Sequence, residues 1–268
     1  MRAHLVQWDL AWHDKQKNHA LVEDLIDPID IQPGDLIVLP EMFDTGFSWD
    51  TKVTADKDHA TLGFLSELAE DLRATIVGGR TIQDCHCTLA RNVATVIGPG
   101  GELLAQYTKR NLFPIGEESR RISPGTSTGT FRLPGTEGSQ EPGLMASLAI
   151  CYDLRFPEVF REGLAQGAEL FIVPACWLEG RHAHWRALLI ARAIENQAYV
   201  LGVNRTGSDP NARYLGGSIA ISPRGDVLGE LDAHPGVLSI PLDPREVRTW
   251  RESFPAWRSV HKALAPGH

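Results

Sequence analysis

Three side chains of this 268-residue sequence have the types and positions that acyl-transfer chemistry requires. Cys151 follows the apolar run 145–150 and precedes a helical pattern that begins near Pro157. A thiol between a strand and a helix is well placed to become a thiolate nucleophile when a base or a cation lies nearby. Cys176 also follows an apolar run. Spacing alone does not separate the two thiols, since a buried free cysteine commonly acts as a small hydrophobe.

Glu41 and Lys109 are the charged partners that such a thiol would need. Glu41 comes directly after the buried run 36–40, where a partly desolvated carboxylate is suited to general-base work. Lys109 lies just past a predicted hairpin strand, and its ammonium could stabilise negative charge on a thiolate or an oxyanion. Taken singly, each residue has a plainer interpretation, as a surface carboxylate and a surface lysine.

The elements that must position these side chains alternate along the chain. Apolar runs typical of buried strands are separated by stretches whose apolar residues share one helical face. This pattern predicts a mixed α/β fold in which sheets are covered by helices. No linker divides it, so residues 1–268 are expected to form a single domain. The predicted strands are 3–8, 36–39, 75–77, 145–150, 170–173 and 199–203; the helices lie near 21–29, 62–72, 157–166 and 184–197; the hairpins are 93–107 and 217–231.

Two stretches of the sequence resemble each other, which suggests that the chain has two related halves. The stretch Asp35–Phe43 and the stretch Glu169–Trp177 each contain an acidic residue, a buried strand, a proline and an aromatic residue three positions later. Any two buried strands look somewhat alike, so this similarity has a trivial alternative. If it is real, the two halves would place side chains at the carboxyl ends of equivalent strands, where α/β folds build their sites.

Composition excludes several other classes of protein. Hydrophobic residues make up 43% of the chain and charged residues 22%, which is ordinary for a globular protein. The net charge of −8 argues against nucleic-acid and anionic-membrane partners. No apolar run reaches the roughly 18 residues of a membrane span, and no signal peptide is evident at the start. Four cysteines in such a chain indicate free thiols and a cytoplasmic location.

Together, the contexts of the three reactive side chains resemble the nitrilase, or carbon–nitrogen hydrolase, superfamily. The matching stretches are Leu39–Phe43, Tyr107–Phe113 and Ala149–Pro157, and their order agrees with the Glu-Lys-Cys triad of that family. The likeness runs over nearly the whole chain and includes Ala191–Val200. The resemblance therefore implies that Glu41, Lys109 and Cys151 are catalytic.

A finer likeness is to the ω-amidase branch, which hydrolyses the terminal amide of 2-oxoglutaramate and 2-oxosuccinamate. It rests on Pro40–Phe47, Cys151–Pro157 and His184–Trp185. This chain departs from related sequences at Cys176, where they commonly carry asparagine before the tryptophan. The departure bears on substrate specificity and leaves the triad intact.

The resemblance also implies the fold, the assembly and the supporting residues. It implies an αββα sandwich, paired into an αββααββα homodimer or a larger assembly, that acts on a small-molecule amide without a metal or organic cofactor. It implies a second glutamate near Lys109, for which Glu118 is the better match in the pair Glu117–Glu118. The backbone N–H of Tyr152 would then share the oxyanion with Lys109.

Three further residues are candidates for binding the substrate. Arg155 could clamp a substrate carboxylate, or could instead form a structural ion pair with Asp153 or Glu158. Phe43 and Trp177 could form pocket walls, although aromatic residues are more often part of a core.

Competing interpretations remain at this point. Residues 125–129 match the G-x-S-x-G pattern of serine hydrolases but lack the strand before and the helix after it. Cys85 and Cys87, with His182 and His184, do not have a standard zinc spacing. A non-catalytic scaffold of the same fold is disfavoured by the intact triad. A nitrilase, a carbamoylase or a general aliphatic amidase would use the same triad, so only the pocket can choose among them.

Overall fold

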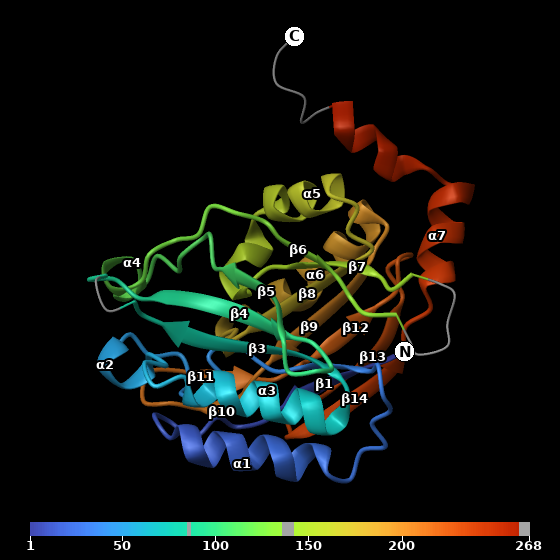
Figure 1. Cartoon of the computed structure of the whole chain (residues 1–268). Coiled ribbons are helices and arrows are strands. Elements are labelled where there is room, and N and C mark those ends of the chain that lie inside the picture. Colours follow the sequence, from blue (N-terminus) through green and yellow to red (C-terminus); the bar gives the residue numbers. More distant parts are fainter. Residues whose placement is uncertain (85–86, 136–141, 263–268) are drawn as a thin grey trace.

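The computed structural model describes residues 1–84, 87–135 and 142–262, and it has two six-stranded sheets between layers of helices (Figure 1). The first sheet has the order β14-β1-β2-β3-β4-β5 and the second β13-β12-β9-β8-β7-β6. The bounds in the first sheet are β1 Arg2–Gln7, β2 Leu36–Val38, β3 Thr75–Ile82, β4 Arg91–Ile97, β5 Leu103–Thr108 and β14 Gly236–Pro241. Those in the second are β6 Gly129–Arg132, β7 Met145–Leu148, β8 Leu170–Ala175, β9 Tyr199–Asn204, β12 Ile219–Ile221 and β13 Val227–Glu230.

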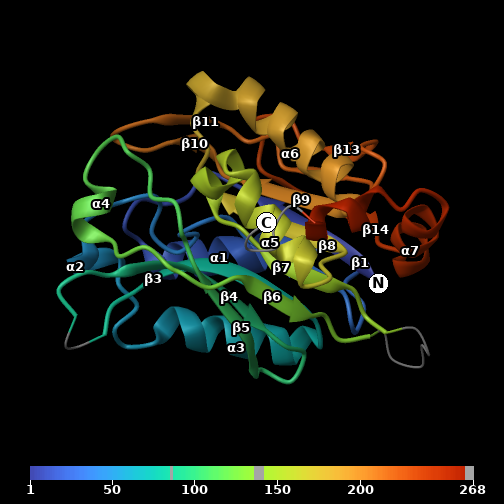
Figure 2. The ribbon, with the colours of Figure 1, turned by 90° about the horizontal axis from the view of Figure 1, so that it is seen from above.

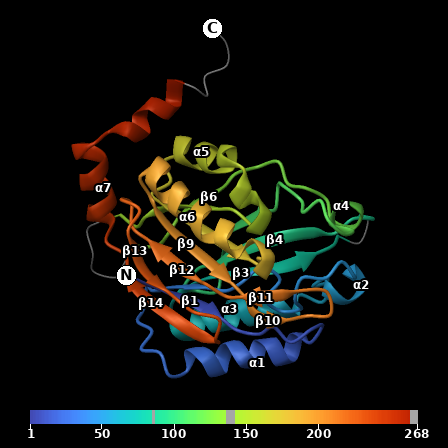
Figure 3. The ribbon, with the colours of Figure 1, turned by 180° about the vertical axis from the view of Figure 1, so that it is seen from behind.

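Helices cover the outer face of each sheet. Helices α1 (Lys15–Ile26) and α3 (Ala60–Leu72) pack on the first sheet, and α6 (His182–Asn196) packs on the second with α5 (Pro157–Ala165) beside it (Figures 2 and 3). The remaining elements are α2 Thr51–Thr54, α4 Glu118–Arg121, α7 Pro244–Ser253, the β10–β11 ribbon (Thr206–Ser208 and Arg213–Leu215), and 3-10 turns at Cys151–Arg155, Glu179–Arg181 and Ala256–Lys262. This arrangement is the expected αββα sandwich.

The two sheets have the same topology. In the first, β1, β2 and β3 run parallel, and β4, β5 and β14 are antiparallel to their neighbours. In the second, β7, β8 and β9 run parallel, and β12, β13 and β6 are antiparallel to theirs. Strand β2 therefore corresponds to β8, and these strands lie in the two similar stretches, Asp35–Phe43 and Glu169–Trp177. The sequence similarity therefore falls on strands that occupy equivalent places in the two sheets.

Apolar side chains explain the layering. The inner faces of both sheets share one cluster that includes Leu5, Val38, Leu148 and Leu201, all fully or almost fully buried. A second cluster lies between the first sheet and its helices, where Leu65 packs with neighbours from α1 and the strands. Burial of such side chains contributes about 1.5–3 kcal/mol each, which makes these two layers the main source of stability.

The structure refines the sequence prediction at several boundaries. The first helix ends at Ile26, because Pro28 has no backbone N–H to continue the helical hydrogen bonds. The stretch 123–143, expected to be a loop, contains the short edge strand β6, which is four residues long and gave no clear periodic signal. Among the described residues, no helix is both long enough and apolar enough to cross a bilayer.

Candidate active site

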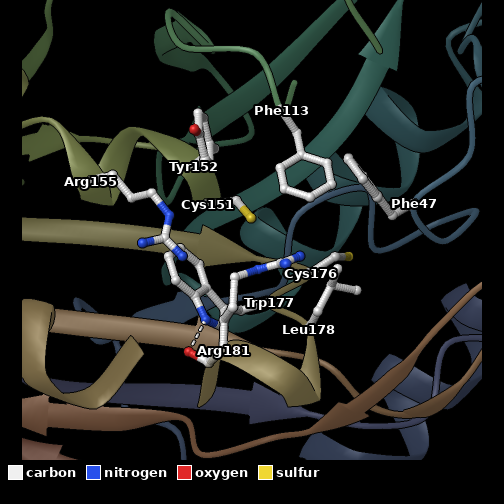
Figure 4. Close-up of a pocket in the computed structure, with 9 residues that line it drawn as sticks. All are labelled: Phe47, Phe113, Cys151, Tyr152, Arg155, Cys176, Trp177, Leu178 and Arg181. Atoms are coloured by element: carbon white, nitrogen blue, oxygen red, sulfur yellow. Dashed lines mark hydrogen bonds between the residues drawn. The ribbon is translucent and has the colours of Figure 1, made fainter. Parts of the chain in front are cut away.

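A narrow cavity lies where the chain leaves strands β7 and β8 (Figure 4). Its volume of about 20 Å³ is little more than one water molecule needs. The cavity is lined by Phe47, Phe113, Cys151, Tyr152, Arg155, Cys176, Trp177, Leu178 and Arg181. Both candidate thiols are therefore at the cavity, and their surroundings distinguish them.

Cys151 occupies a strained turn directly after β7. Its φ is +46°, a left-handed conformation that costs a residue other than glycine about 1–2 kcal/mol. Cys151 also begins the 3-10 turn that leads into α5, and its side chain is 8% exposed. Strained residues of this kind concentrate at functional sites.

Asp153 fastens this turn to the segment that carries Lys109. One carboxylate oxygen of Asp153 accepts hydrogen bonds from the backbone N–H of Ile150 (3.0 Å) and the hydroxyl of Tyr107 (2.8 Å). The other accepts from the backbone N–H of Asn111 (2.7 Å) and from its side-chain amide (2.9 Å). Burial raises the pKa of Asp153, while these donors oppose the rise. Three of these hydrogen bonds join the Cys151 turn to β5 and the segment after it, and the fourth closes the turn itself.

Lys109 is fully buried between two carboxylates. Its Nζ lies 3.0 Å from Oε1 of Glu41, and 2.9 Å and 3.2 Å from the two oxygens of Glu118. Burial alone would lower the pKa of Lys109, but the charges of Glu118 and Glu41 outweigh it and hold that pKa well above its usual value. Lys109 is consequently held as an ammonium, and its Nζ lies 5.1 Å from the ring centroid of Phe47, which lines the cavity.

Glu41 is held by two groups that the sequence analysis missed. The side-chain amide of Asn92 donates to Oε1 (2.7 Å), and the backbone N–H of Cys176 donates to Oε2 (2.9 Å). Asn92 is a buried polar residue in the otherwise apolar run of β4, which was its available signal. Gly79 of β3 is also required, because a Cβ there would lie 2.7 Å from Cα of Glu41.

The electrostatics keep the Cys151 thiol protonated at rest. Burial raises the pKa of the Cys151 thiol well above its usual value, and the charge of Glu41 raises it further, against the opposing charge of Lys109. Burial and Glu41 also raise the pKa of the Cys176 thiol, which donates to the backbone carbonyl of Glu41 at 3.2 Å. An attacking thiol at this site must therefore transfer its proton to a base.

Arg155 and Trp177 both line the cavity. The guanidinium of Arg155 stacks over Trp177, with 4.8 Å from its central carbon to the ring centroid, and lies 3.4 Å from Nδ1 of His184. Among the described residues it makes no ion pair with Asp153 or Glu158, so the structural ion-pair alternative is wrong. Tyr152 is the residue after the nucleophile, and its ring packs edge-on against Phe113 at 5.6 Å.

Phe43 does not form a wall of this cavity, contrary to the sequence prediction. Its ring is fully buried on the outer side of the first sheet, where it packs near Trp8 and Phe64. The chain turns after β2, with Met42 in a left-handed conformation, so Phe43 lies in that core and Phe47 from the same segment reaches the cavity instead. Phe113, from the segment after Lys109, supplies a second aromatic wall.

The rival motifs do not gain support. Residues 125–128 form a loop followed by strand β6, so no helix follows Ser127 as a nucleophile elbow requires. Cys85 lies outside the described residues, and Cys87 is an exposed free thiol. The part of the chain that the structure describes contains no group of three His, Cys, Asp or Glu side chains arranged to hold a metal ion.

Comparison with known proteins decides the family. The carbon–nitrogen hydrolase family model matches residues 2–252. This chain belongs to the carbon–nitrogen hydrolase family. It is thus a hydrolase that acts on carbon–nitrogen bonds, as the order of Glu41, Lys109 and Cys151 predicted.

Relatives of this carbon–nitrogen hydrolase include amidases. The 2-oxoglutaramate amidase of Bacillus subtilis (strain 168) is 33% identical, with 97% of each chain covered. The omega-amidase YafV of Escherichia coli (strain K12) is also 33% identical, with 96% of this chain and 95% of YafV covered. XC1258 from Xanthomonas campestris, a CN-hydrolase superfamily protein solved with an arsenic adduct in its active site, superposes with a TM-score of 0.86 at 30% identity, covering 97% of this chain and 96% of its own.

Proposed function

We propose that this hydrolase cleaves the terminal amide of a short carboxylate amide, such as 2-oxoglutaramate or 2-oxosuccinamate, to the dicarboxylate and ammonia. The observation that carries the proposal is the buried ammonium of Lys109, held at 2.9–3.2 Å between Glu41 and Glu118 and 5.1 Å from the ring centroid of Phe47, which lines the cavity with Cys151. This constellation supplies a nucleophile, a base and a fixed positive charge without a metal or an organic cofactor.

The first step is acylation of Cys151. Glu41 accepts the thiol proton as the sulfur attacks the amide carbonyl, because the raised pKa of Cys151 makes spontaneous ionisation unfavourable. The ammonium of Lys109 and the backbone N–H of Tyr152 stabilise the oxyanion that forms. Glu41 then returns the proton to the leaving nitrogen, the C–N bond breaks, and ammonia departs from a thioester on Cys151.

The second step is hydrolysis of the thioester. Glu41, again a carboxylate, takes a proton from a water molecule that attacks the same carbonyl. The oxyanion returns to the position stabilised by Lys109, and its collapse expels the thiolate, which recovers the proton from Glu41. Glu118 orients Lys109 in both steps, since it accepts from Nζ with both of its oxygens.

Arg155 is the proposed contact for the substrate carboxylate. Its guanidinium stacks on Trp177 at the cavity, and its planar fork could exchange the long 3.4 Å contacts with His184 for a bidentate pair with a carboxylate. The names of the Bacillus subtilis and Escherichia coli relatives support the same class of substrate.

Ammonia release from a small panel tests the proposal. The panel contains 2-oxoglutaramate, 2-oxosuccinamate, glutamine, an N-carbamoyl amino acid and an aliphatic nitrile, each with wild type and Cys151→Ala. Cysteine-dependent ammonia from the two oxo-amides alone would support the ω-amidase activity. Ammonia from the nitrile or the carbamoyl compound would agree with the triad but contradict the proposed substrate class. No ammonia from any of the five compounds would favour a non-catalytic scaffold.

We also propose that the protein pairs through the helical face of its second sheet. Ile194 of α6 and Phe254 after α7 are each 54% exposed, and the ring of Trp250 packs at a tilt against that of Phe254, with 5.4 Å between the centroids. Exposed apolar side chains gathered in this way are typical of an interface. Sedimentation at micromolar concentration should show a dimer or a larger species, weakened by Ile194→Asp; a monomer would contradict the pairing.

A further inference from the structure

Arg181 places a second guanidinium in the cavity, and no sequence motif had pointed to it. It is the last residue of the 3-10 turn Glu179–Arg181, directly before α6. Its side chain extends into the cavity, with 5.2 Å from its central carbon to the ring centroid of Phe113 (Figure 4). Among the described residues, no carboxylate lies within ion-pair distance of it.

A single indole holds both cavity arginines in place. The ring face of Trp177 carries the guanidinium of Arg155, and its Nε1 donates to the backbone carbonyl of Arg181 at 2.7 Å. The backbone N–H of Trp177 is itself fixed by the side chain of Asn204 at 2.7 Å. Trp177 thus contacts the guanidinium of Arg155 through its ring face and fixes the backbone from which the Arg181 side chain extends.

The charge balance of the cavity calls for an anionic ligand. The nine lining residues include two guanidiniums and no carboxylate, in a chain whose net charge is −8. The nearby carboxylates are engaged elsewhere, because Glu41 and Glu118 both pair with Lys109. Two partly buried cations without a counter-charge are stabilised most by a planar anion that accepts several N–H donors at once.

We propose that Arg181 is a specificity-determining residue that binds the substrate carboxylate together with Arg155. This inference rests on the proposed amidase function and assigns the recognition of its substrate. The amide end lies at Cys151, and the carboxylate at the far end of a short linear chain lies between the two guanidiniums. A neutral amide of equal length fills the same space and leaves both cations without a partner.

Matched substrates measure this recognition directly. Glutaramate and pentanamide have the same amide and chain length, but glutaramate has a carboxylate where pentanamide has a methyl group. The preference is the ratio of their kcat/KM values. In Arg181→Met we expect this ratio to fall about ten- to a hundredfold, the worth of one charge-assisted hydrogen-bonded contact. Arg181→Lys keeps the charge without the planar fork, so its ratio should lie between those of wild type and Arg181→Met.

The control is Arg186→Met, in helix α6 directly after Arg181. Arg186 is exposed and pairs with Glu230 at 3.0 Å, outside the cavity, so this variant should keep the wild-type ratio. A ratio in Arg181→Met equal to that of Arg186→Met would overturn the proposal. The thermal unfolding midpoints of the variants exclude misfolding as the cause of a loss.

A binding measurement separates failure of this inference from failure of the proposed function. Titration calorimetry of glutarate into the Cys151→Ala protein needs no turnover. Weaker glutarate binding when Arg181→Met is added would support the carboxylate site, even if the panel showed activity on another amide. Unchanged affinity, or no binding of glutarate to the parent variant, would overturn it.

Discussion

The backbone N–H of Cys176 lies 2.9 Å from Oε2 of Glu41, and it donates the only main-chain hydrogen bond to this carboxylate among the described residues. Cys176 sits directly after β8, and Glu41 follows β2, the equivalent strand of the other sheet. The contact therefore joins the ends of two related strands across the sandwich. Cys176 thus contributes to the site through its backbone N–H.

The two buried cysteines are expected to respond differently to substitution. Cys176→Ser keeps the backbone contact to Glu41, so its kcat/KM should stay within about tenfold of wild type. Cys151→Ala removes the nucleophile, and kcat should fall about a thousandfold or more. Steady-state ammonia release measures both. Equal losses in the two variants would contradict the assignment of Cys151 as nucleophile.

Asn92 is expected to act as a positioning residue for Glu41. Asn92→Ala removes the 2.7 Å donor to Oε1 while leaving the backbone carbonyl that accepts from the N–H of Lys109. We expect kcat to fall about ten- to a hundredfold with little change in KM, because a misdirected base impairs proton transfer rather than binding. A folded variant with wild-type kcat would show that Lys109 and Cys176 suffice to hold Glu41.

Glu118 should control the pH range over which Lys109 is charged. Burial lowers the pKa of Lys109 and the charge of Glu118 is the largest opposing influence, so Glu118→Gln lets this pKa fall. The ammonium is then lost at a lower pH, and the alkaline limb of the kcat profile should move to lower pH. Glu117→Gln is the matched control, since Glu117 is exposed and pairs with Arg120 and Arg121 instead. Identical profiles for the two variants would refute this role.

Asp44, close to Glu41 in sequence, should make stability depend on pH. Burial raises its pKa to about 6, and the nearby charge of Lys15 only partly offsets this rise. The folded state thus binds the proton more tightly than the unfolded chain, whose carboxyl has a pKa of about 4, and the contribution of Asp44 to stability falls as pH rises from about 4 to 6.

Asp44→Asn removes this dependence. The free energy of unfolding of the variant, minus that of wild type, should increase by about 3 kcal/mol between pH 4 and 7, from two pKa units at 1.36 kcal/mol each. Urea unfolding at a series of pH values measures the difference. Asp58→Asn, at an exposed position of the same region, is the control and should give a curve parallel to wild type. A flat difference for Asp44→Asn would mean that Asp44 titrates normally.

Local sequence determined the strands, the main helices and the order of the triad. Buried strands such as β8 are continuous apolar runs, and a turn after each strand positions the next residue, so Glu41, Lys109 and Cys151 could be chosen from their contexts. The similarity between the sequences of β2 and β8 could also be recognised, since both strands are buried at equivalent places in the two sheets.

Only the tertiary structure decided which side chains meet. Asn92 reaches Glu41 across 51 residues of sequence, and the backbone N–H of Cys176 across 135, through contacts that no local pattern encodes. The direction of a side chain after a strand ends depends on the loop, so Phe43 turned into the core and Phe47 and Arg181 into the cavity. The reacting groups could be predicted from the sequence because their chemistry requires those residue types. The groups that orient them, and the cations proposed to bind the substrate, were determined by packing between the two sheets.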